Sequence, residues 1–361
     1  MSVRSYFSET YADARAKFVA ACADAGLELE SHRHPLTGPD DGPLFVDVVR
    51  MGPADAKRLL LTVSATHGVE GFCGSGCQIG WLKEELWREL PDGVGMLMVH
   101  AINPYGFAWI RRVNEDNVDL NRNFVDHDAA PADNPGYREL ADTLCPAEWD
   151  EASAKLTRIA SQAFIDRHGD RAFVAAVSSG QYSHADGIFY GGREPVWSNR
   201  LMHEICTREM GHVRQLAVID FHTGLGPYGY GELICRHPPD SDALARARRW
   251  YGDSVTSPSM GQSASPVIDG NLRMAPVGWL PDAQVTSTAI EYGTYPEDRV
   301  FDAIRADNWL HLHGDLTTPK GRAIKAEMRE MFYPAADDWK DMVWERAVQV
   351  QRQALRGLAG N

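Results

Sequence analysis

A histidine and a glutamate three positions apart, His67 and Glu70, lie in the segment TVSATHGVEG. An apolar run from Arg58 to Thr66 precedes the pair and predicts a strand that ends there. Imidazole and carboxylate groups are ligands of Zn²⁺, and the flanking glycines allow a sharp turn that aims both side chains at one ion. The spacing therefore makes this segment a candidate metal site.

A third candidate ligand, His222, ends a later apolar run, LAVIDFH. A catalytic zinc ion uses three protein ligands and leaves one position for water. His67, Glu70 and His222 would form such a set if the fold brings the two segments together. The alternative is that both histidines are hydrogen-bonded residues at strand ends, without a metal.

Two further segments place polar side chains at the ends of expected strands. The first, NPYGFAWIRRVNEDNVDLNRNF (103–124), follows the apolar run GMLMVHAINP and is rich in asparagine and arginine. Arginine binds carboxylates bidentately, so this segment is a candidate subsite for a carboxylate or a developing oxyanion. A solvated loop whose asparagines stabilise turns is the alternative. The second segment is TSTAIEYG (286–293), which carries Glu291 near its end.

The order of expected strands and helices predicts the fold that must position these residues. Strands ending at Thr66, His222 and Glu291 alternate with helical patterns, and the carboxyl ends of parallel strands form a crevice in open α/β sheets. We therefore predict a three-layer α/β/α fold with a mixed, mostly parallel twisted sheet. The main expected strands are 44–51, 58–66, 95–104, 216–222, 231–236 and 286–293, and the main helices are 72–89, 297–313, 317–331 and 336–358.

Two local expectations follow from loop composition. The Pro-, Gly- and Asp-rich segment 32–43 is predicted to be a loop. The short turn at 52–55 predicts that strands 44–51 and 58–66 are antiparallel neighbours.

The chain of 361 residues is predicted to be one domain, residues 1–361, with an inserted elaboration at about 126–215. The inserted part has helical patterns at 137–144, 146–167 and 197–210 around a glycine-bearing centre at 178–192. No linker-like stretch separates it from the rest. Its aromatic and glycine content fits either the lining of a pocket or ordinary surface packing.

Composition excludes several classes of partner. A net charge of −14 argues against binding nucleic acid or an anionic membrane surface. No apolar run approaches the roughly 18 residues of a membrane span, and the first residues lack the apolar core of a signal peptide. The six scattered cysteines fit reduced thiols better than a disulfide framework. We therefore expect a cytoplasmic protein with no nucleic-acid or membrane partner; its oligomeric state is open.

Taken together, the motifs resemble those of the zinc carboxypeptidase superfamily. The similarity is nearest to bacterial carboxypeptidase-like proteins and to the succinylglutamate desuccinylase and aspartoacylase branch. It spans residues 58–293 and leaves the long insert uncovered. The segments that carry it, in the family's order, are His67-x-x-Glu70, NPYGF (103–107), Arg112-x-Asn114, VDLNRNF (118–124), His222 after its strand, and Glu291 in AIEYG.

The resemblance implies a role for each of these residues. One zinc ion per chain would have three ligands: His67, Glu70 and His222. Glu291 would be the general base that takes a proton from water and passes it to the leaving nitrogen. Arg112 would polarise the scissile carbonyl, and Asn121 and Arg122 would bind a free carboxylate of the substrate.

We therefore predict a zinc-dependent hydrolase that cleaves an amide bond adjacent to a free carboxylate. Two enzymatic interpretations stay open: a carboxypeptidase acting on short peptides, and a deacylase acting on N-acyl amino acids. A non-catalytic, zinc-stabilised protein that binds small carboxylates is the alternative from another class, although a protein that only binds needs neither Glu291 nor Arg112. One departure from the digestive enzymes leaves specificity open, because no tyrosine lies between Tyr251 and Glu291 to serve as their mobile loop tyrosine.

Overall fold

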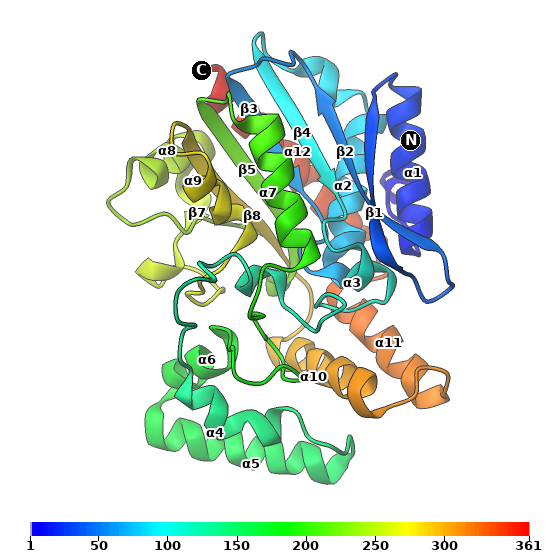
Figure 1. Ribbon diagram of the computed structural model, residues 1–361, viewed down its shortest axis with the longest axis vertical. Coiled ribbons are helices and arrows are strands. Elements are labelled where there is room, and N and C mark those ends of the chain that lie inside the picture. Colours follow the sequence, from blue (N-terminus) through cyan, green and yellow to red (C-terminus); the bar gives the residue numbers. More distant parts are fainter. Residues whose placement is uncertain (1, 361) are drawn as a thin grey trace.

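The computed structural model describes residues 2–360 and has one mixed sheet at its centre (Figure 1). Its eight strands follow one another in the order β1-β2-β4-β3-β5-β8-β6-β7. Strands β4, β3, β5 and β8 are parallel neighbours in the middle, whereas β1, β2 and β6 run antiparallel to the strands they flank. The strands are β1 (Leu29–Thr37), β2 (Pro43–Met51), β3 (Arg58–Val63), β4 (Val94–His100), β5 (Gln215–Tyr228), β6 (Gly231–Ile234), β7 (Val255–Thr256) and β8 (Gln284–Gly293).

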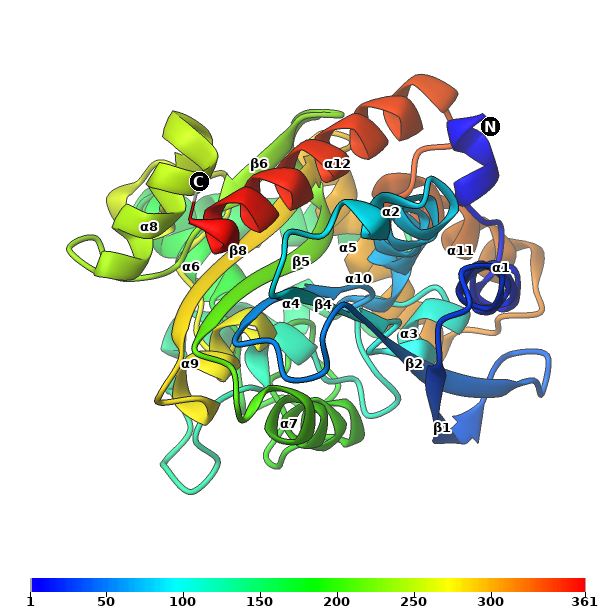
Figure 2. The same cartoon turned by 90° about the horizontal axis from the view of Figure 1, so that it is seen from above.

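Helices cover both faces of the sheet, so the predicted α/β/α architecture is confirmed. Figure 2 shows α2 and α12 on one side of the strands and α7 on the other. The central strand β4 is buried along its whole length, as expected for a strand covered on both faces. One layer contains α1 (Tyr11–Asp24), α2 (Gly71–Lys83), α8 (Asp242–Tyr251) and α12 (Asp337–Ala359), and the other contains α7 (Trp197–Met210) and α9 (Ala275–Trp279).

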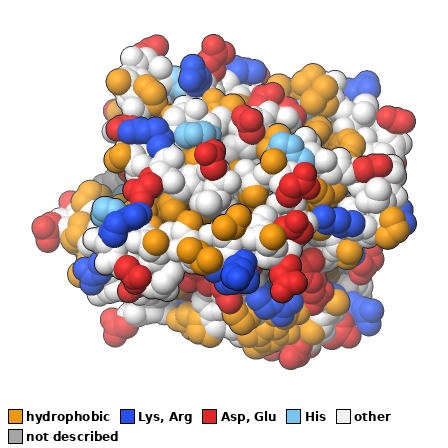
Figure 3. Space-filling model, turned by 90° about the horizontal axis from the view of Figure 1, so that it is seen from below, with side chains coloured by type: hydrophobic (Ala, Val, Ile, Leu, Met, Phe, Trp, Pro, Cys, Tyr) orange, Lys and Arg blue, Asp and Glu red, His pale blue; other side chains and the backbone are white. Residues whose placement is uncertain are grey.

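A further group of helices lies beyond the carboxyl ends of the central strands (Figure 1). Part of the predicted insert, α4 to α6, packs here against α10 and α11 around a shared apolar cluster. Figure 3 shows this end of the molecule, where hydrophobic side chains lie among charged ones of both signs. The helices of this group are α4 (Pro135–Leu144), α5 (Glu151–His168), α6 (Asp170–Ser178), α10 (Glu297–His313) and α11 (Pro319–Phe332).

Two local expectations were wrong. The predicted loop 32–43 contains most of β1, which pairs antiparallel with β2 at the edge of the sheet. Its polar residues and Pro35 hid the strand, yet proline is tolerated at an edge where no neighbour needs its N–H. Strands β2 and β3 are not neighbours, because β4 lies between them. A short turn constrains the direction of the next strand but does not decide its partner.

Other differences concern helices. The expected helix 72–89 ends at Lys83, and Glu85 then adopts a left-handed conformation with φ of 54°. Helices α3 (Pro104–Ala108), α6, α8 and α9 were not predicted, whereas α10 has the expected bounds. None of the helices within residues 2–360 combines the length and the apolar character needed to cross a membrane.

Candidate active site

The turn after β3 brings the three predicted metal ligands together. One potential ligand atom from each of His67, Glu70 and His222 lies within 4.8 Å of the other two. Strands β3 and β5 are parallel neighbours, so the residues that follow β3 reach the same edge of the sheet as His222 on β5. The turn requires glycine at position 68, since a Cβ there would lie 2.0 Å from the backbone carbon of Gly106. The three ligand residues are buried, with exposed fractions of 4%, 1% and 2%.

The two histidines present the same ring nitrogen to Glu70. Nδ1 of His67 and Nδ1 of His222 each lie 2.9 Å from a different oxygen of the Glu70 carboxylate. Behind them, Nε2 of His67 lies 3.0 Å from Asp119 Oδ1, and Nε2 of His222 lies 2.7 Å from Asp220 Oδ2. Carboxylates in this position orient metal-binding imidazoles and strengthen them as ligands.

Sequence analysis did not identify Asp119 and Asp220, although signals for both were present. Asp119 lies in the VDLNRNF segment itself. Asp220 is two residues before His222 on β5, and side chains two apart in a strand share a face. Asp220 also accepts a hydrogen bond of 2.8 Å from Thr66 Oγ1, which links the ends of the two strands.

The electrostatic field at the three ligand residues favours a cation. Burial alone would raise the pKa of Glu70, but His67 and His222 lower it below its ordinary range. Burial would lower the pKa of His222, yet Asp220 and Glu70 raise it to about 10. Asp119 is also held ionised, with a pKa well below its usual value despite burial. Two imidazoles and a carboxylate converge here with two further carboxylates behind them, and this donor set suits Zn²⁺.

Glu291 lies beside the ligands on the neighbouring strand. It is the register partner of His222 in the parallel β5–β8 ladder. Its Oε1 accepts a hydrogen bond of 3.2 Å from the Leu225 backbone N–H. Burial and the negative charge of Glu70 raise the pKa of Glu291 to about 7. A carboxylate with a pKa near neutrality is suited to general acid–base chemistry.

Arg112 contacts the ligand residues directly. Its Nη1 donates to Glu70 Oε1 at 3.3 Å, and its Nε donates to Asp119 Oδ2 at 3.0 Å. The preceding Arg111 is directed elsewhere, because its Nε donates to Asp307 at 3.4 Å. The structure therefore brings Arg112, rather than Arg111, to the site. Its predicted role toward a carbonyl oxygen stays a prediction.

Asn121 and Arg122 also reach the site, but protein atoms occupy much of their bonding capacity. Asn121 Nδ2 lies 3.4 Å from His222 Nε2, and its Oδ1 accepts from the Leu272 N–H at 3.1 Å. Arg122 donates through Nη1 to the Asn121 carbonyl at 3.0 Å and through Nη2 to the Ser178 carbonyl at 2.6 Å. Their predicted contact with a substrate carboxylate stays a prediction.

All seven predicted site residues line one cavity of about 650 Å³. We call the part formed by His67, Glu70 and His222 the metal end. Helices α5, α6 and α10 form much of the opposite wall, so part of the insert lines the pocket. Phenylalanines, among them Phe189 and Phe301, contribute to the lining, and among the residues described no tyrosine does. The mobile loop tyrosine of the digestive enzymes therefore has no counterpart among the described residues that line this cavity.

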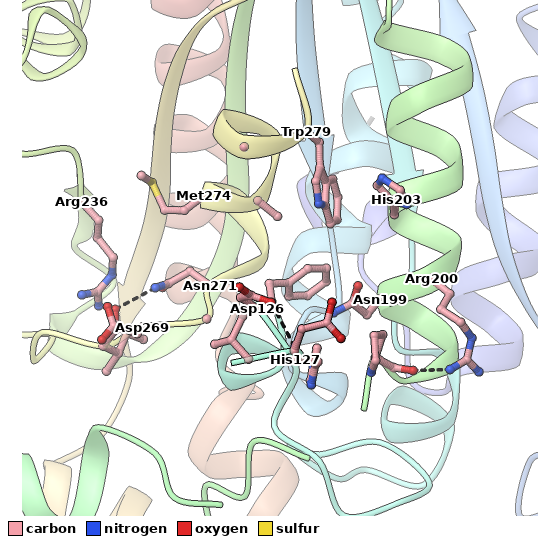
Figure 4. Close-up of a pocket in the computed structure, with 18 residues that line it drawn as sticks. Asp126, His127, Asn199, Arg200, His203, Arg236, Asp269, Asn271, Met274 and Trp279 are labelled. Carbon is pink, nitrogen blue, oxygen red and sulfur yellow. Dashed lines mark hydrogen bonds between the residues drawn. The ribbon is translucent and has the colours of Figure 1, made fainter. Parts of the chain in front are cut away.

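A second cavity of about 820 Å³ adjoins the first and shares Arg236 and Ile268 with it (Figure 4). Figure 4 shows His203 on α7 directed toward Trp279, and the centroids of their rings are 4.8 Å apart. No metal-ligand group involves this cavity, because His67, Glu70 and His222 form the one such group found within residues 2–360.

Comparison with known proteins bears on the fold. No curated protein matches the chain. Among solved structures, it is similar to thrombin activatable fibrinolysis inhibitor, with 13% identity, 98% of this chain and 75% of that chain covered, and a TM-score of 0.53. It is also similar to carboxypeptidase A from Helicoverpa armigera (13% identity, 91% and 74% covered, TM-score 0.44) and to succinylglutamate desuccinylase from Chromobacterium violaceum (13% identity, 89% and 74% covered, TM-score 0.37). Such low identities show the fold alone, and the predicted zinc carboxypeptidase-like fold is confirmed.

A family model covers nearly the whole chain. It is described as protein of unknown function (DUF2817) and matches residues 7–346. The matched region includes every site residue from His67 to Glu291. The chain therefore belongs to the DUF2817 family and has the fold of the zinc carboxypeptidases.

Proposed function

We propose that this protein is a zinc-dependent hydrolase that cleaves an amide bond next to a free carboxylate. One observation carries the proposal: the ligand atoms of His67, Glu70 and His222 converge within 4.8 Å, and Glu291 lines the same cavity in register with His222. A site for binding alone would not need a buried glutamate whose pKa is raised to about 7 beside the ligands.

The residues divide the chemistry among them. A zinc ion held by the three ligands would supply Lewis-acid catalysis and make water more acidic. Glu291 takes the proton from the attacking water and returns it to the leaving nitrogen. The Arg112 guanidinium stabilises the negative charge that develops on the carbonyl oxygen. Asn121 and Arg122 bind the free carboxylate and so place the amide at the metal end.

The size and walls of the cavity support a small substrate. A volume of about 650 Å³ with α5 and α6 along one wall is within the range of small-molecule sites, roughly 300–1,000 Å³. Dipeptides and N-acyl amino acids both fit this class. The six cysteines are all unpaired, which supports a reducing compartment such as the cytoplasm.

Replacing Glu291 by Gln tests the proposal. The variant should keep one zinc ion per chain and lose at least ~100-fold in kcat, because general-base catalysis contributes about 10²–10⁴-fold. Dipeptides with a free C-terminus and N-acyl amino acids would be assayed with and without a chelator, and metal content measured by atomic emission.

Glu232→Gln is the matched control for this substitution. Glu232 is the register partner of Glu291 on β6 and is 6% exposed, but it does not line the cavity. Its replacement should change kcat only a few-fold. Full activity in Glu291→Gln would exclude the proposed mechanism, and absence of hydrolysis in the zinc-loaded native protein across the panel would exclude the proposed function.

A further inference from the structure

A buried arginine without a counter-ion lies in the wall of the catalytic cavity. Arg273, in the short helix η7 (Leu272–Met274), is 2% exposed and lines the cavity. Its Nε and Nη2 have no hydrogen-bond partner, and within residues 2–360 no carboxylate oxygen lies within 4.0 Å of its guanidinium. Burying an unpaired charge is costly, so this arrangement calls for an explanation.

Other buried arginines of this chain donate hydrogen bonds to protein atoms. Arg246 is 8% exposed, and its Nε and Nη2 donate to Thr286 Oγ1 at 2.6 Å and to the Val285 carbonyl at 2.9 Å. Arg305 is 3% exposed and bonds to Asp302, Thr157 and the Leu144 carbonyl. Because these two guanidinium groups donate to protein atoms, the lack of partners for both Nε and Nη2 of Arg273 is not shared by all buried arginines here.

A second arginine stands next to the first. Arg236 also lines the cavity; it donates to the Pro266 carbonyl at 2.8 Å and to Ser265 Oγ at 2.6 Å, and its Nε has no partner. Burial, followed by repulsion from Arg273 and Arg122, lowers the pKa of Arg236 to about 8. Two like charges are therefore held together in the wall of one cavity. We call Arg236 and Arg273 the arginine end.

Strand β8 connects the arginine end to the metal end. Ser287 Oγ donates to the Arg273 carbonyl at 2.8 Å, and the Ser287 N–H donates to His237, next to Arg236, at 3.1 Å. Ser287 is four residues before Glu291 on β8, a distance of about 13 Å along an extended strand. Between them, Ala289 lines the cavity with only a methyl group, which leaves space for a substrate side chain.

We infer that the arginine end binds a second carboxylate, so that the residue released by amide cleavage is acidic, of the aspartate or glutamate type. The Arg273 guanidinium has two nitrogens without a partner in the protein, and a carboxylate accepts bidentately from neighbouring guanidinium nitrogens. Aspartate and glutamate are the amino acids whose side chains supply that group. This inference rests on the proposed function, and it names the substrate class.

Paired substrates that differ only in side-chain charge test the inference. N-acetyl-Glu is compared with N-acetyl-Gln, and the dipeptide Ala-Glu with Ala-Gln, as ratios of kcat/KM. The native protein should favour the acidic member, and Arg273→Gln should reduce that ratio by about 10- to 100-fold, the effect of losing a hydrogen-bonded charge pair. Arg236→Gln should reduce it less, because the hydrogen bonds of Arg236 to the protein leave it fewer free donors. Arg214→Gln is the charge-matched control, since Arg214 is 57% exposed and outside the cavity, and should leave the ratio unchanged.

Stability separates a ligand-binding arginine from a structural one. Arg273→Met should raise the unfolding temperature of the ligand-free protein, because it removes a buried unpaired charge. Arg246→Met should lower it, because it removes the hydrogen bonds that Arg246 Nε and Nη2 donate to Thr286 and Val285. A lower unfolding temperature for Arg273→Met would overturn the assignment of an unpaired charge at this position.

Binding of free amino acids distinguishes failure of this inference from failure of the proposed function. L-glutamate should raise the unfolding temperature of the native protein more than L-glutamine does, and Arg273→Gln should remove the difference. If glutamate binds in this way but no amide is hydrolysed, the proposed function fails and the acidic subsite stands. If amides are hydrolysed with no preference for the acidic member, the inference is overturned and the proposed function stands.

Discussion

The two ends of the cavity of about 650 Å³ differ in how their charged side chains are paired. At the metal end, His67 and His222 each have a carboxylate partner on both ring nitrogens, and Glu70 is shared between them. At the arginine end, Arg273 has two buried nitrogens without a partner and Arg236 has one. Both ends lie in the same cavity and use side chains at or next to strands of the same sheet.

The difference shows where a bound ion or ligand would neutralise charge that the protein leaves unbalanced. The metal end is an ordered set of donors held by Asp119 and Asp220, and its excess negative charge suits a cation. The arginine end has excess positive charge, and a carboxylate would neutralise it. A buried ion without a partner costs several kcal/mol, so such a group marks a site for a ligand better than a fully paired network does.

Removing a ligand of the metal end should have the largest effect. His222→Ala should lose stoichiometric zinc and reduce turnover to the background rate, since two ligands do not hold zinc in a catalytic geometry. Atomic emission on the purified protein and a hydrolysis assay measure both. His203→Ala, in the second cavity, is the control and should keep its metal; a full complement of zinc in His222→Ala would remove this residue from the ligand set.

A smaller effect is expected from replacing a carboxylate that orients a metal ligand. Asp119→Asn keeps the shape of the side chain but removes the charge that faces His67 and Arg112. Zinc affinity or kcat/KM should fall by about 10–100-fold, as for other residues that orient metal ligands. Competition with a chromogenic chelator gives the affinity. Asp116→Asn in the same loop is the control, and an unchanged affinity in Asp119→Asn would show that the metal end does not depend on this partner.

The smallest expected effect is the dependence of kcat/KM on pH, which tests the role of Glu291 beside the metal end. If Glu291 is the base, as proposed, only its ionised form is active, and activity falls as the pH drops through its pKa. That pKa is raised to about 7 by burial and Glu70, whereas a bound cation would oppose the shift. We therefore expect log kcat/KM to decline with unit slope below a midpoint at or under pH 7. The Glu291→Gln variant should lack this limb; retention of the same limb would assign it to another group.

Much of the fold could be predicted because many elements have strong local patterns. The strands β4, β5 and β8 were found from local apolar runs, and the helix α10 was found from its local pattern. Strand β1 was missed because an edge strand of polar residues has no apolar alternation to detect. The pairing of β2 with β4 was missed because strand partners depend on contacts distant in the chain.

The candidate site was predictable to a similar degree. His67, Glu70 and His222 stand at strand ends within recognisable motifs, and the structure brings them together. Arg236 and Arg273 belong to no motif; Arg236 ends the expected strand 231–236, and Arg273 lies in a loop-rich segment. Their importance arises from what surrounds them, because only the folded chain shows that Arg273 is buried and lacks an acid.

By itself, the sequence determined the local elements, the metal-ligand motif and the family resemblance, since each depends only on residue type and spacing. Tertiary structure alone decided which strands are neighbours, which walls enclose the cavity and which charges lack a partner. The physical reason is that hydrophobic periodicity records burial one segment at a time, whereas pairing and charge balance depend on atoms contributed by distant segments.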